Sequence, residues 1–212
     1  RDTASEFLPQ PASELASAGG FRWSIAKLGG ERGPTGDSCV GGPSVPVVTT
    51  FEALLSQYTW NGVQVAGRPV FLTFSFDQVA ATSAGGRLPS AFLASFRAFS
   101  ESEQELARRA LAIWADASGV TFFEVGPGQG DLRFGSYDFT LAPPQLTDFA
   151  AFAYFPQVFD FADGAWEDDW GGDMFFDYGF ADFETLLHEI GHALGLDHPF
   201  EGPITLDRSV DS

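Results

Sequence analysis

The sequence contains few residues of several kinds, and each scarcity excludes a class of function or structure. Only 11 basic side chains stand against 29 acidic ones, so the 212 residues carry a formal net charge of -18. Binding of phosphate groups needs a positive surface, so we expect no nucleic-acid partner and no anionic membrane surface. Cys39 is the single cysteine, which excludes a disulfide within these residues. Apolar runs stay shorter than the roughly 18 residues of a membrane-spanning helix, so we expect no membrane insertion.

Hydrophobic residues are abundant, and their distribution divides the chain into two parts. They make up 44% of the sequence, which is enough to bury a core and argues against wholesale disorder. Residues 1–45 differ from the rest, because the stretch from Leu28 to Pro43 consists almost entirely of turn-forming residues. We therefore predict an N-terminal arm or pro-segment over residues 1–45 and one folded domain over residues 46–212.

Within the folded part, the spacing of apolar residues predicts strands, a helix, more strands and a final helix. Ser100 and Glu103 have the spacing of a capping box ahead of the first helix, and Gly119 is expected to end it. This order of elements indicates an α/β or α+β layered fold. The predicted strands are Val70–Phe76, Val120–Val125, Asp131–Phe134 and Ala150–Phe155; the predicted helices are residues 101–118 and Phe183–Leu196; residues 157–182 are predicted to form a long acidic, aromatic loop.

All three histidines of the chain lie between residues 188 and 198. On a helix, His188 and His192 are four residues apart, so both imidazoles project from one face and can bind one tetrahedral zinc ion. Gly195 allows a sharp turn with positive φ, after which His198 can supply a third nitrogen. Three protein ligands leave the fourth position for water, which is typical of a catalytic zinc site. H-E-x-x-H alone also arises by chance in unrelated helices, but the glycine and third histidine in register favour a metal site.

Glu189 follows the first histidine and lies next to the predicted metal-facing side of the helix. A carboxylate at this position can reach a water molecule in the open metal position and take its proton, as a general base must. We therefore predict Glu189 as the catalytic residue, and His188, His192 and His198 as the metal ligands.

The segment from His188 to His198 resembles the H-E-x-x-H-x-x-G-x-x-H motif of the metzincin zinc endopeptidases. Pro199 after the third histidine, together with the preceding Thr185-Leu-Leu, makes it most similar to the serralysin branch. Weaker similarity to that branch covers about residues 50 to 200. It is carried by Leu54–Gly62, Trp114, Thr121–Val125, Gly130–Gly135 and Ala151–Tyr154.

The resemblance implies a secreted, extracellular, zinc-dependent endopeptidase that acts on protein or peptide substrates. It also implies an α/β (α+β) metzincin-like fold, with a twisted, mostly parallel sheet, an antiparallel edge strand and two long helices. The zinc helix would lie under the substrate cleft. A substrate would add a strand to the edge of the sheet, and Ala150–Phe155 is the segment expected to form that edge.

One feature of the resembled family, a methionine-containing turn, is missing from the sequence. Metzincins place a methionine-containing turn after the third histidine, whereas the sole methionine, Met174, precedes the zinc helix and the sequence ends at Ser212. We therefore expect an incomplete C-terminal subdomain, and the protein's own C-terminal fragment is a candidate partner. The alternative function is a catalytically silent or latent zinc-bearing fragment or binding module. Glu189 favours the enzyme, because a chain that only bound zinc would not need a base there.

Two further features leave alternatives open. Cys39 lies upstream of the catalytic region, and some metzincin relatives hold a pro-segment cysteine in the open zinc position; the favoured alternative is a thiol that packs as a small hydrophobe. The stretch Asp160–Asp182 could hold calcium, because hard cations prefer clustered carboxylate oxygens. Its spacing does not fit the twelve-residue calcium loop, so a solvated charged loop is favoured. Zinc is the predicted cofactor, and calcium is a second candidate.

Overall fold

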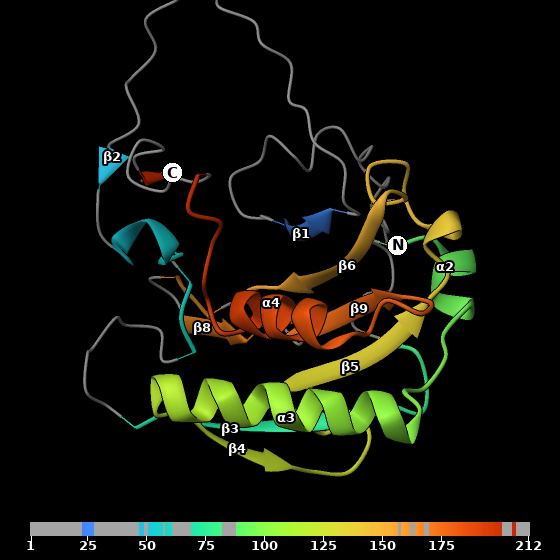
Figure 1. The fold of residues 1–212 in the computed structure, drawn as a ribbon, viewed down its shortest axis with the longest axis horizontal. Coiled ribbons are helices and arrows are strands. Elements are labelled where there is room, and N and C mark those ends of the chain that lie inside the picture. The colour runs from blue at the N-terminus through green and yellow to red at the C-terminus, as the bar shows by residue number, and fades with distance from the viewer. Residues whose placement is uncertain are drawn as a thin grey trace, which may run out of the picture.

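The structure, a computed structural model, is built around one six-stranded sheet in the order β1-β6-β9-β5-β3-β4 (Figure 1). It describes residues 23–27, 47–48, 51–56, 58–60, 69–81, 88–156, 158–161, 164–167, 170–200 and 205–206. The strands of the sheet are β1 (Trp23–Lys27), β3 (Phe71–Phe76), β4 (Thr121–Glu124), β5 (Leu132–Tyr137), β6 (Phe149–Tyr154) and β9 (Asp173–Asp177).

The sheet is mostly parallel, as predicted. Strands β4, β3, β5 and β9 run parallel to one another, β6 is antiparallel to β9, and β1 is antiparallel to β6. Two short pairs complete the described strands: β7 (Val158–Phe161) with β8 (Gly164–Glu167), and β2 (Val47–Val48) with β10 (Thr205–Leu206). This arrangement agrees with the α/β, metzincin-like fold class.

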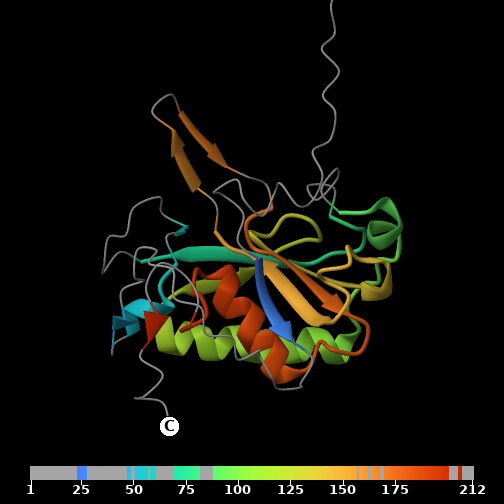
Figure 2. The same ribbon diagram turned by 90° about the horizontal axis from the view of Figure 1, so that it is seen from above.

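Two helices pack beside each other on one face of the sheet, as Figure 2 shows from above. They are α3 (Glu101–Ser118) and α4 (Phe183–Ala193); the short α2 (Ser90–Ala94) and the 3-10 turns η1 (Phe51–Leu54) and η2 (Phe139–Leu141) lie elsewhere. The predicted capping box of α3 is confirmed, with Ser100 and Glu103 bonding each other's backbone N–H groups. Gly119 ends the helix at φ 76°, as its predicted role requires.

The prediction of a loop over residues 157–182 is wrong at β7, β8 and β9, and β9 lies inside the central sheet. Met174, Phe175 and Phe176 are all buried. A central strand of a parallel sheet is covered on both faces, so its sequence shows no alternation of apolar and polar residues. With Asp173 and Asp177 at its two ends, the apolar run was too short to be recognised as a strand.

The predicted edge strand, β6, is antiparallel, as expected. It is not the outermost strand of the sheet. β6 is antiparallel to its inner neighbour β9. Its outer side is covered by β1, with pairs from Trp23 opposite Tyr154 to Lys27 opposite Phe149. β1 comes from the segment predicted to be an arm, and its pairing partner is distant in sequence, so no local pattern indicated it.

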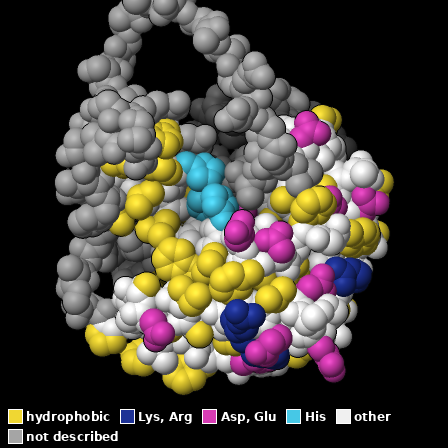
Figure 3. Space-filling model, in the orientation of Figure 1, with side chains coloured by type: hydrophobic (Ala, Val, Ile, Leu, Met, Phe, Trp, Pro, Cys, Tyr) yellow, Lys and Arg dark blue, Asp and Glu magenta, His cyan; other side chains and the backbone are white. Residues whose placement is uncertain are grey.

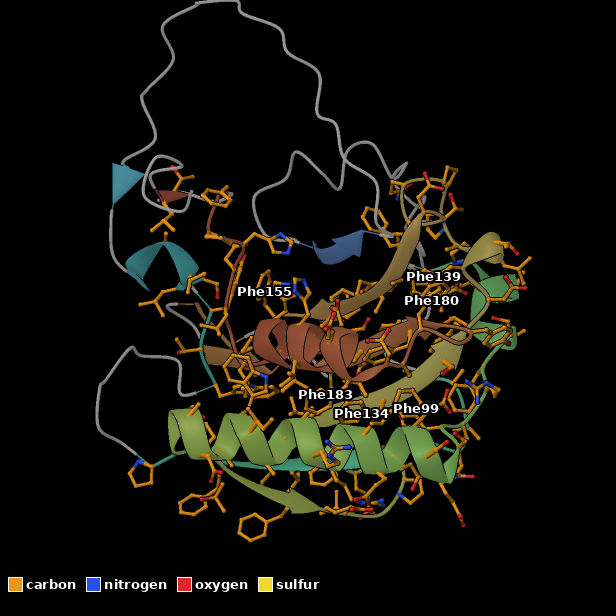
Figure 4. The ribbon with its side chains drawn as sticks, in the orientation of Figure 1. Phe99, Phe134, Phe139, Phe155, Phe180 and Phe183 are labelled. Carbon is orange, nitrogen blue, oxygen red and sulfur yellow. The ribbon has the colours of Figure 1, made fainter. Side chains whose placement is uncertain are left out.

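Phenylalanines form much of the core on both faces of the sheet, and among those labelled in Figure 4 the buried ones are Phe99, Phe134, Phe139 and Phe155. Phe99 and Phe134 pack between the sheet and the helices α3 and α4, with Phe183 at the margin of this layer. Phe139 belongs to a second buried cluster on the opposite face, in which the rings of Phe152 and Phe175 stack with centroids 4.6 Å apart. Among the described residues, no helix is long and apolar enough to span a membrane.

Candidate metal centre

Helix α4 carries two of the three histidines, and its sequence determines which face is buried. Asp182 caps its first turn, because its side chain accepts hydrogen bonds from the backbone N–H groups of Glu184 and Thr185. Leu186 and Ile190 are fully buried in the core between α4 and the sheet. These two residues fix which face of α4 is turned to the core. The helical spacing then places His188 and His192 together on one side of the helix.

The backbone turns sharply just after α4, as the sequence predicted. Gly195 has φ 103°, and a Cβ atom placed there would lie 2.7 Å from the carbonyl oxygen of Tyr58. The Gly195 carbonyl accepts a hydrogen bond from Ser56, and the N–H of Asp197 donates to the Leu54 carbonyl. A residue with a side chain would be strained and would collide at this position, so glycine is required for the turn that returns the chain towards α4.

The turn brings all three histidines together, and Figure 3 shows them gathered at one place on the surface. The Nε2 atom of His188 lies 2.8 Å from Nε2 of His192 and 3.1 Å from Nε2 of His198. A tetrahedral zinc with bonds of about 2.0–2.1 Å separates its nitrogen ligands by about 3.3 Å. The three nitrogens thus converge on a space of the size that zinc requires, and the donor set fits that ion.

The hydrogen bonding of His192 prepares its Nε2 atom for a metal. Its Nδ1 atom lies 2.6 Å from the carbonyl oxygen of Leu196. A carbonyl can only accept, so Nδ1 carries the proton and Nε2 keeps its lone pair. Burial lowers the pKa of His192 to about 3, and the neighbouring His188 and His198 add to this effect. Burial also lowers the pKa of His188, with a further contribution from His198. Neutral imidazoles are the form that binds metal.

Glu189 is fully buried in the same helix. Both of its carboxylate oxygens are shielded from solvent. It follows His188 directly, so it lies next to the face that carries the histidines, as the sequence predicted. The general base proposed from the sequence therefore has no contact with bulk water in this conformation.

Sequence reasoning missed the two tryptophans that hold α4 in place. The indole Nε1 of Trp114 donates to the carbonyl of Leu187 over 2.9 Å, and Nε1 of Trp60 donates to the carbonyl of Ala193 over 2.9 Å. Trp114 also lies against Gly191, where an added Cβ would come within 3.0 Å of Cζ2. Local sequence patterns carry no signal for such bonds, because each joins residues that are far apart along the chain.

At the sheet end of the site, Phe155, which Figure 4 labels, lies beside His192. Its ring centroid is 5.8 Å from that of His192, with the planes at 83°. Phe155 directly follows β6, so this contact places the carboxyl end of β6 next to the imidazole of His192. The close approach of Gly195 to Pro156 supports the same placement, since an added Cβ would lie 3.7 Å from the proline ring.

Where the structure describes the acidic stretch considered for calcium, its carboxylates bind other groups of the protein. Arg133 binds Asp173 through two hydrogen bonds, one of them 2.9 Å long from Nη2. Asp177 accepts from the backbone N–H groups of Phe139 and Tyr178. Among the described side chains, the three histidines form the one cluster with the spacing of a metal site. These remaining candidates lie outside the described side chains: Cys39, Asp160, Asp163, Glu167, Asp168 and Asp169.

Comparison with known proteins shows that the sequence of this chain is similar to sequences of peptidases. The model of the matrixin family of peptidases matches residues 94–203, a span that includes α3, most of the sheet and the three histidines. Serralysin G of Dickeya chrysanthemi is 38% identical over 152 residues, which cover 66% of this chain and 29% of that protein. Serralysin B of the same organism is 32% identical over 154 residues, covering 68% of this chain and 29% of its own length.

A third relative shows the same pattern. Serralysin of Proteus mirabilis is 32% identical over 160 residues, covering 66% of this chain and 30% of that protein. The matched region thus spans less than a third of the length of each of these relatives.

Proposed function

Because the chain belongs to the matrixin family of peptidases and is a serralysin-like metzincin, we propose that it is a secreted, zinc-dependent endopeptidase that hydrolyses peptide bonds in protein or peptide substrates. His188, His192 and His198 are the proposed zinc ligands, and Glu189 is the proposed general base. The observation that carries this proposal is the convergence of three Nε2 atoms on one space next to a buried carboxylate.

The bound metal would supply Lewis acidity that polarises the scissile carbonyl and lowers the pKa of a water molecule. The protein's own groups move the protons. The carboxylate of Glu189 takes the proton from the attacking water and delivers it to the nitrogen of the leaving amine. The hydrogen bond from Nδ1 of His192 to the Leu196 carbonyl fixes the ring, so that its Nε2 lone pair stays directed at the metal position.

The proposal extends to domains, partners and location. Residues 46–212 form the catalytic domain, and residues 1–45 are an arm or pro-segment. The protein's own C-terminal part is a proposed partner, which the greater length of the relatives supports. An extracellular location is supported by the likeness to serralysins and by the net charge of -18, which keeps an exported protein hydrated. Calcium stays a candidate second cofactor.

The roles of the site residues can be tested with two matched variants on α4. Glu189→Gln removes the base and keeps the size of the side chain, whereas Glu184→Gln removes an exposed carboxylate in the first turn of the same helix. We expect Glu189→Gln to bind one equivalent of zinc, as the unmodified chain does. Its peptide hydrolysis should fall by about 10²–10⁴-fold, the usual contribution of a general base. Glu184→Gln should retain both properties.

The outcomes separate the two candidate functions. Hydrolysis by Glu189→Gln at the rate of the unmodified chain would contradict the role of Glu189. Stoichiometric zinc without any hydrolysis by the unmodified chain would favour the latent or silent zinc-bearing fragment. Loss of zinc in variants of His188, His192 or His198 tests the ligand assignment independently of turnover.

A further inference from the structure

Strand β4 forms the margin of the six-stranded sheet that lies opposite to β1 and β6, and among the described strands it pairs with β3 alone (Figure 1). The N–H groups of Thr121 and Val125 donate to carbonyl groups at and just before β3. Successive residues of a strand direct their backbone groups to opposite sides. The N–H and C=O groups of Phe122 and Glu124 therefore point away from β3, along a margin that has the form needed to accept a further strand.

A groove with a volume of about 450 Å³ lies between this strand and helix α3, which contacts it. Leu111, Ala112 and Ala115 line the groove from α3, and Phe74 and Phe122 line it from the sheet. Ala112 is exposed, so the groove is open to solvent. Neighbouring strands direct side chains at paired positions to the same face of a sheet. A strand added beside β4 would therefore place alternate side chains in this apolar groove.

The opposite face of the sheet is also apolar at this margin. Phe123 follows Phe122 in the strand, so its side chain lies on the face away from α3. Phe123 is 51% exposed and Phe71 is 64% exposed, and their rings stack with centroids 6.3 Å apart. An added strand would thus meet apolar side chains on both of its faces, and exposed apolar surface of this kind marks sites of interaction.

The two ends of the groove differ in charge. At one end, Arg108 joins α3 to β4 through hydrogen bonds of 2.7 and 2.8 Å to the carboxylate of Glu124, so the two charges compensate each other. At the other end, Asp116 is an exposed carboxylate in the last turn of α3, a turn that contains no basic residue. The carbonyl groups at the end of a helix carry partial negative charge, so a carboxylate there is unfavourable and the site attracts a cation.

We propose that the margin of β4 binds an extended segment of another protein, which joins the sheet beside β4 and places a basic side chain next to Asp116. An antiparallel strand is expected, because antiparallel pairs are the more stable per residue. Its residues opposite Phe122 and Phe123 are apolar, and its residue opposite Val120 carries the positive charge. The net charge of -18 opposes a second copy of this chain as the occupant. The inference goes beyond the proposed function, because the site lies at the margin opposite to β6 and uses neither zinc nor Glu189.

The probe is a fluorescently labelled synthetic peptide, acetyl-Thr-Val-Thr-Phe-Leu-Thr-Arg-amide, and a second peptide has Glu in place of Arg. Binding to the zinc-loaded chain is followed by anisotropy, with Glu189→Gln present throughout so that a bound peptide is not cleaved. Asp116→Lys reverses the charge at the end of the groove. Its matched control is Glu101→Lys, which reverses an exposed charge on the same helix about 22 Å away along the axis. Ala112→Trp fills the groove from an exposed position of α3.

We expect the Arg peptide to bind at least about fivefold more tightly than the Glu peptide, because attraction to one partly exposed carboxylate is replaced by repulsion. Asp116→Lys should reverse this preference, and Glu101→Lys should leave it unchanged. Ala112→Trp should weaken the binding of both peptides at least about tenfold, since the apolar side chain of the peptide is no longer buried. Hydrogen exchange at the amides of Phe122 and Glu124 should slow on binding, whereas the amides of Thr121 and Val125 already donate to carbonyl groups and should change little.

Absence of binding, a preference that Asp116→Lys does not change, or protection of β6 amides in place of those of β4 would each overturn the proposal. Protection of Phe122 and Glu124 that rises with protein concentration in the absence of peptide would show a second copy at this margin, and would overturn it as well. Neither measurement depends on turnover. Peptide hydrolysis by the unmodified chain without binding at β4 would therefore support the endopeptidase and contradict only the site at β4.

Discussion

Gly191 lies between the two histidines of α4, and its contact with Trp114 sets up a sharp test of how the helix is held. A Cβ atom added at Gly191 would lie 3.0 Å from Cζ2 and 3.5 Å from Cη2 of the indole. The ring cannot easily move away, because its Nε1 atom donates to the Leu187 carbonyl. Gly191→Ala therefore forces α3 and α4 apart, while Trp114→Phe removes the atoms that Cβ would meet.

The magnitudes follow from two opposing effects. Alanine is favoured over glycine inside a helix by about 0.8–1.0 kcal/mol. Overpacking of a well-filled contact costs about 1–3 kcal/mol. Gly191→Ala should thus lower the free energy of unfolding by about 1 kcal/mol in the unmodified chain. In a chain that already carries Trp114→Phe, the same change should raise it by about 1 kcal/mol, because only the propensity effect remains. The coupling between the two substitutions is then about 2 kcal/mol.

The assay is urea denaturation of the two single variants, the double variant and the unmodified chain, all in EDTA so that metal binding does not contribute to stability. Zinc affinity, measured separately, should weaken in Gly191→Ala and recover in the double variant, since the helix that carries His188 and His192 returns to its position. Additive effects on unfolding, with a coupling below about 0.5 kcal/mol, would refute the inferred contact between Trp114 and the zinc helix.

Three other predictions concern the pH dependence, the turn after α4 and the metal. Burial alone would raise the pKa of Glu103, but hydrogen bonds from Arg97 and from Ser100 lower it from 4.5 to about 2. This carboxylate therefore stabilises the fold above the unfolded-state pKa of 4.5, and the contribution is lost as the pH falls towards 2. Because Arg97 is partly exposed, Glu103→Gln should cost only about 1 kcal/mol at pH 7, and the difference in urea midpoint should shrink steadily as the pH falls from 4.5 through 2; a difference that stays constant over this range would contradict the assignment. Gly195→Ala should lower the free energy of unfolding by at least about 1–3 kcal/mol through the left-handed backbone and should weaken zinc binding in a competition titration; unchanged values would contradict the turn geometry. Zinc at 100 times its dissociation constant should stabilise the chain by about 2.7 kcal/mol, and calorimetry should show a rise in Tm that His198→Ala abolishes; an equal rise in both chains would exclude His198 as a ligand.

The elements that the sequence predicted well are those specified by neighbouring residues. The capping box of Ser100 and Glu103 and the glycine stop at Gly119 act within one helical turn, so they can be read directly from spacing. The gathering of the histidines has a similar origin, because two of them share a helix face and Gly195 determines the turn that returns the third. Their roles as ligands, and that of Glu189 as base, stay predictions that the variants above test.

The elements that the sequence did not predict depend on contacts between distant parts of the chain. β9 is hidden because both of its faces are buried, so Met174-Phe-Phe176 shows no period-two alternation. β1 is recognisable only from its partner, since Ile25 lies opposite Phe152 in the sheet. The indole hydrogen bonds that hold α4 have the same character. Such contacts can be identified only from the three-dimensional structure, because no local motif specifies them.

The pairing of β1 with β6 also constrains the order of events during protein synthesis. β1 leaves the ribosome early, but its partner strand appears only after most of the sheet has been translated. Contacts between such distant segments form slowly, because a large loop has to be closed first. The edge of β6 is therefore unpaired in the newly made chain, at the stage when unpaired edges invite association with other chains. The newly made chain therefore exposes the edge of β6 until β1 has paired with it.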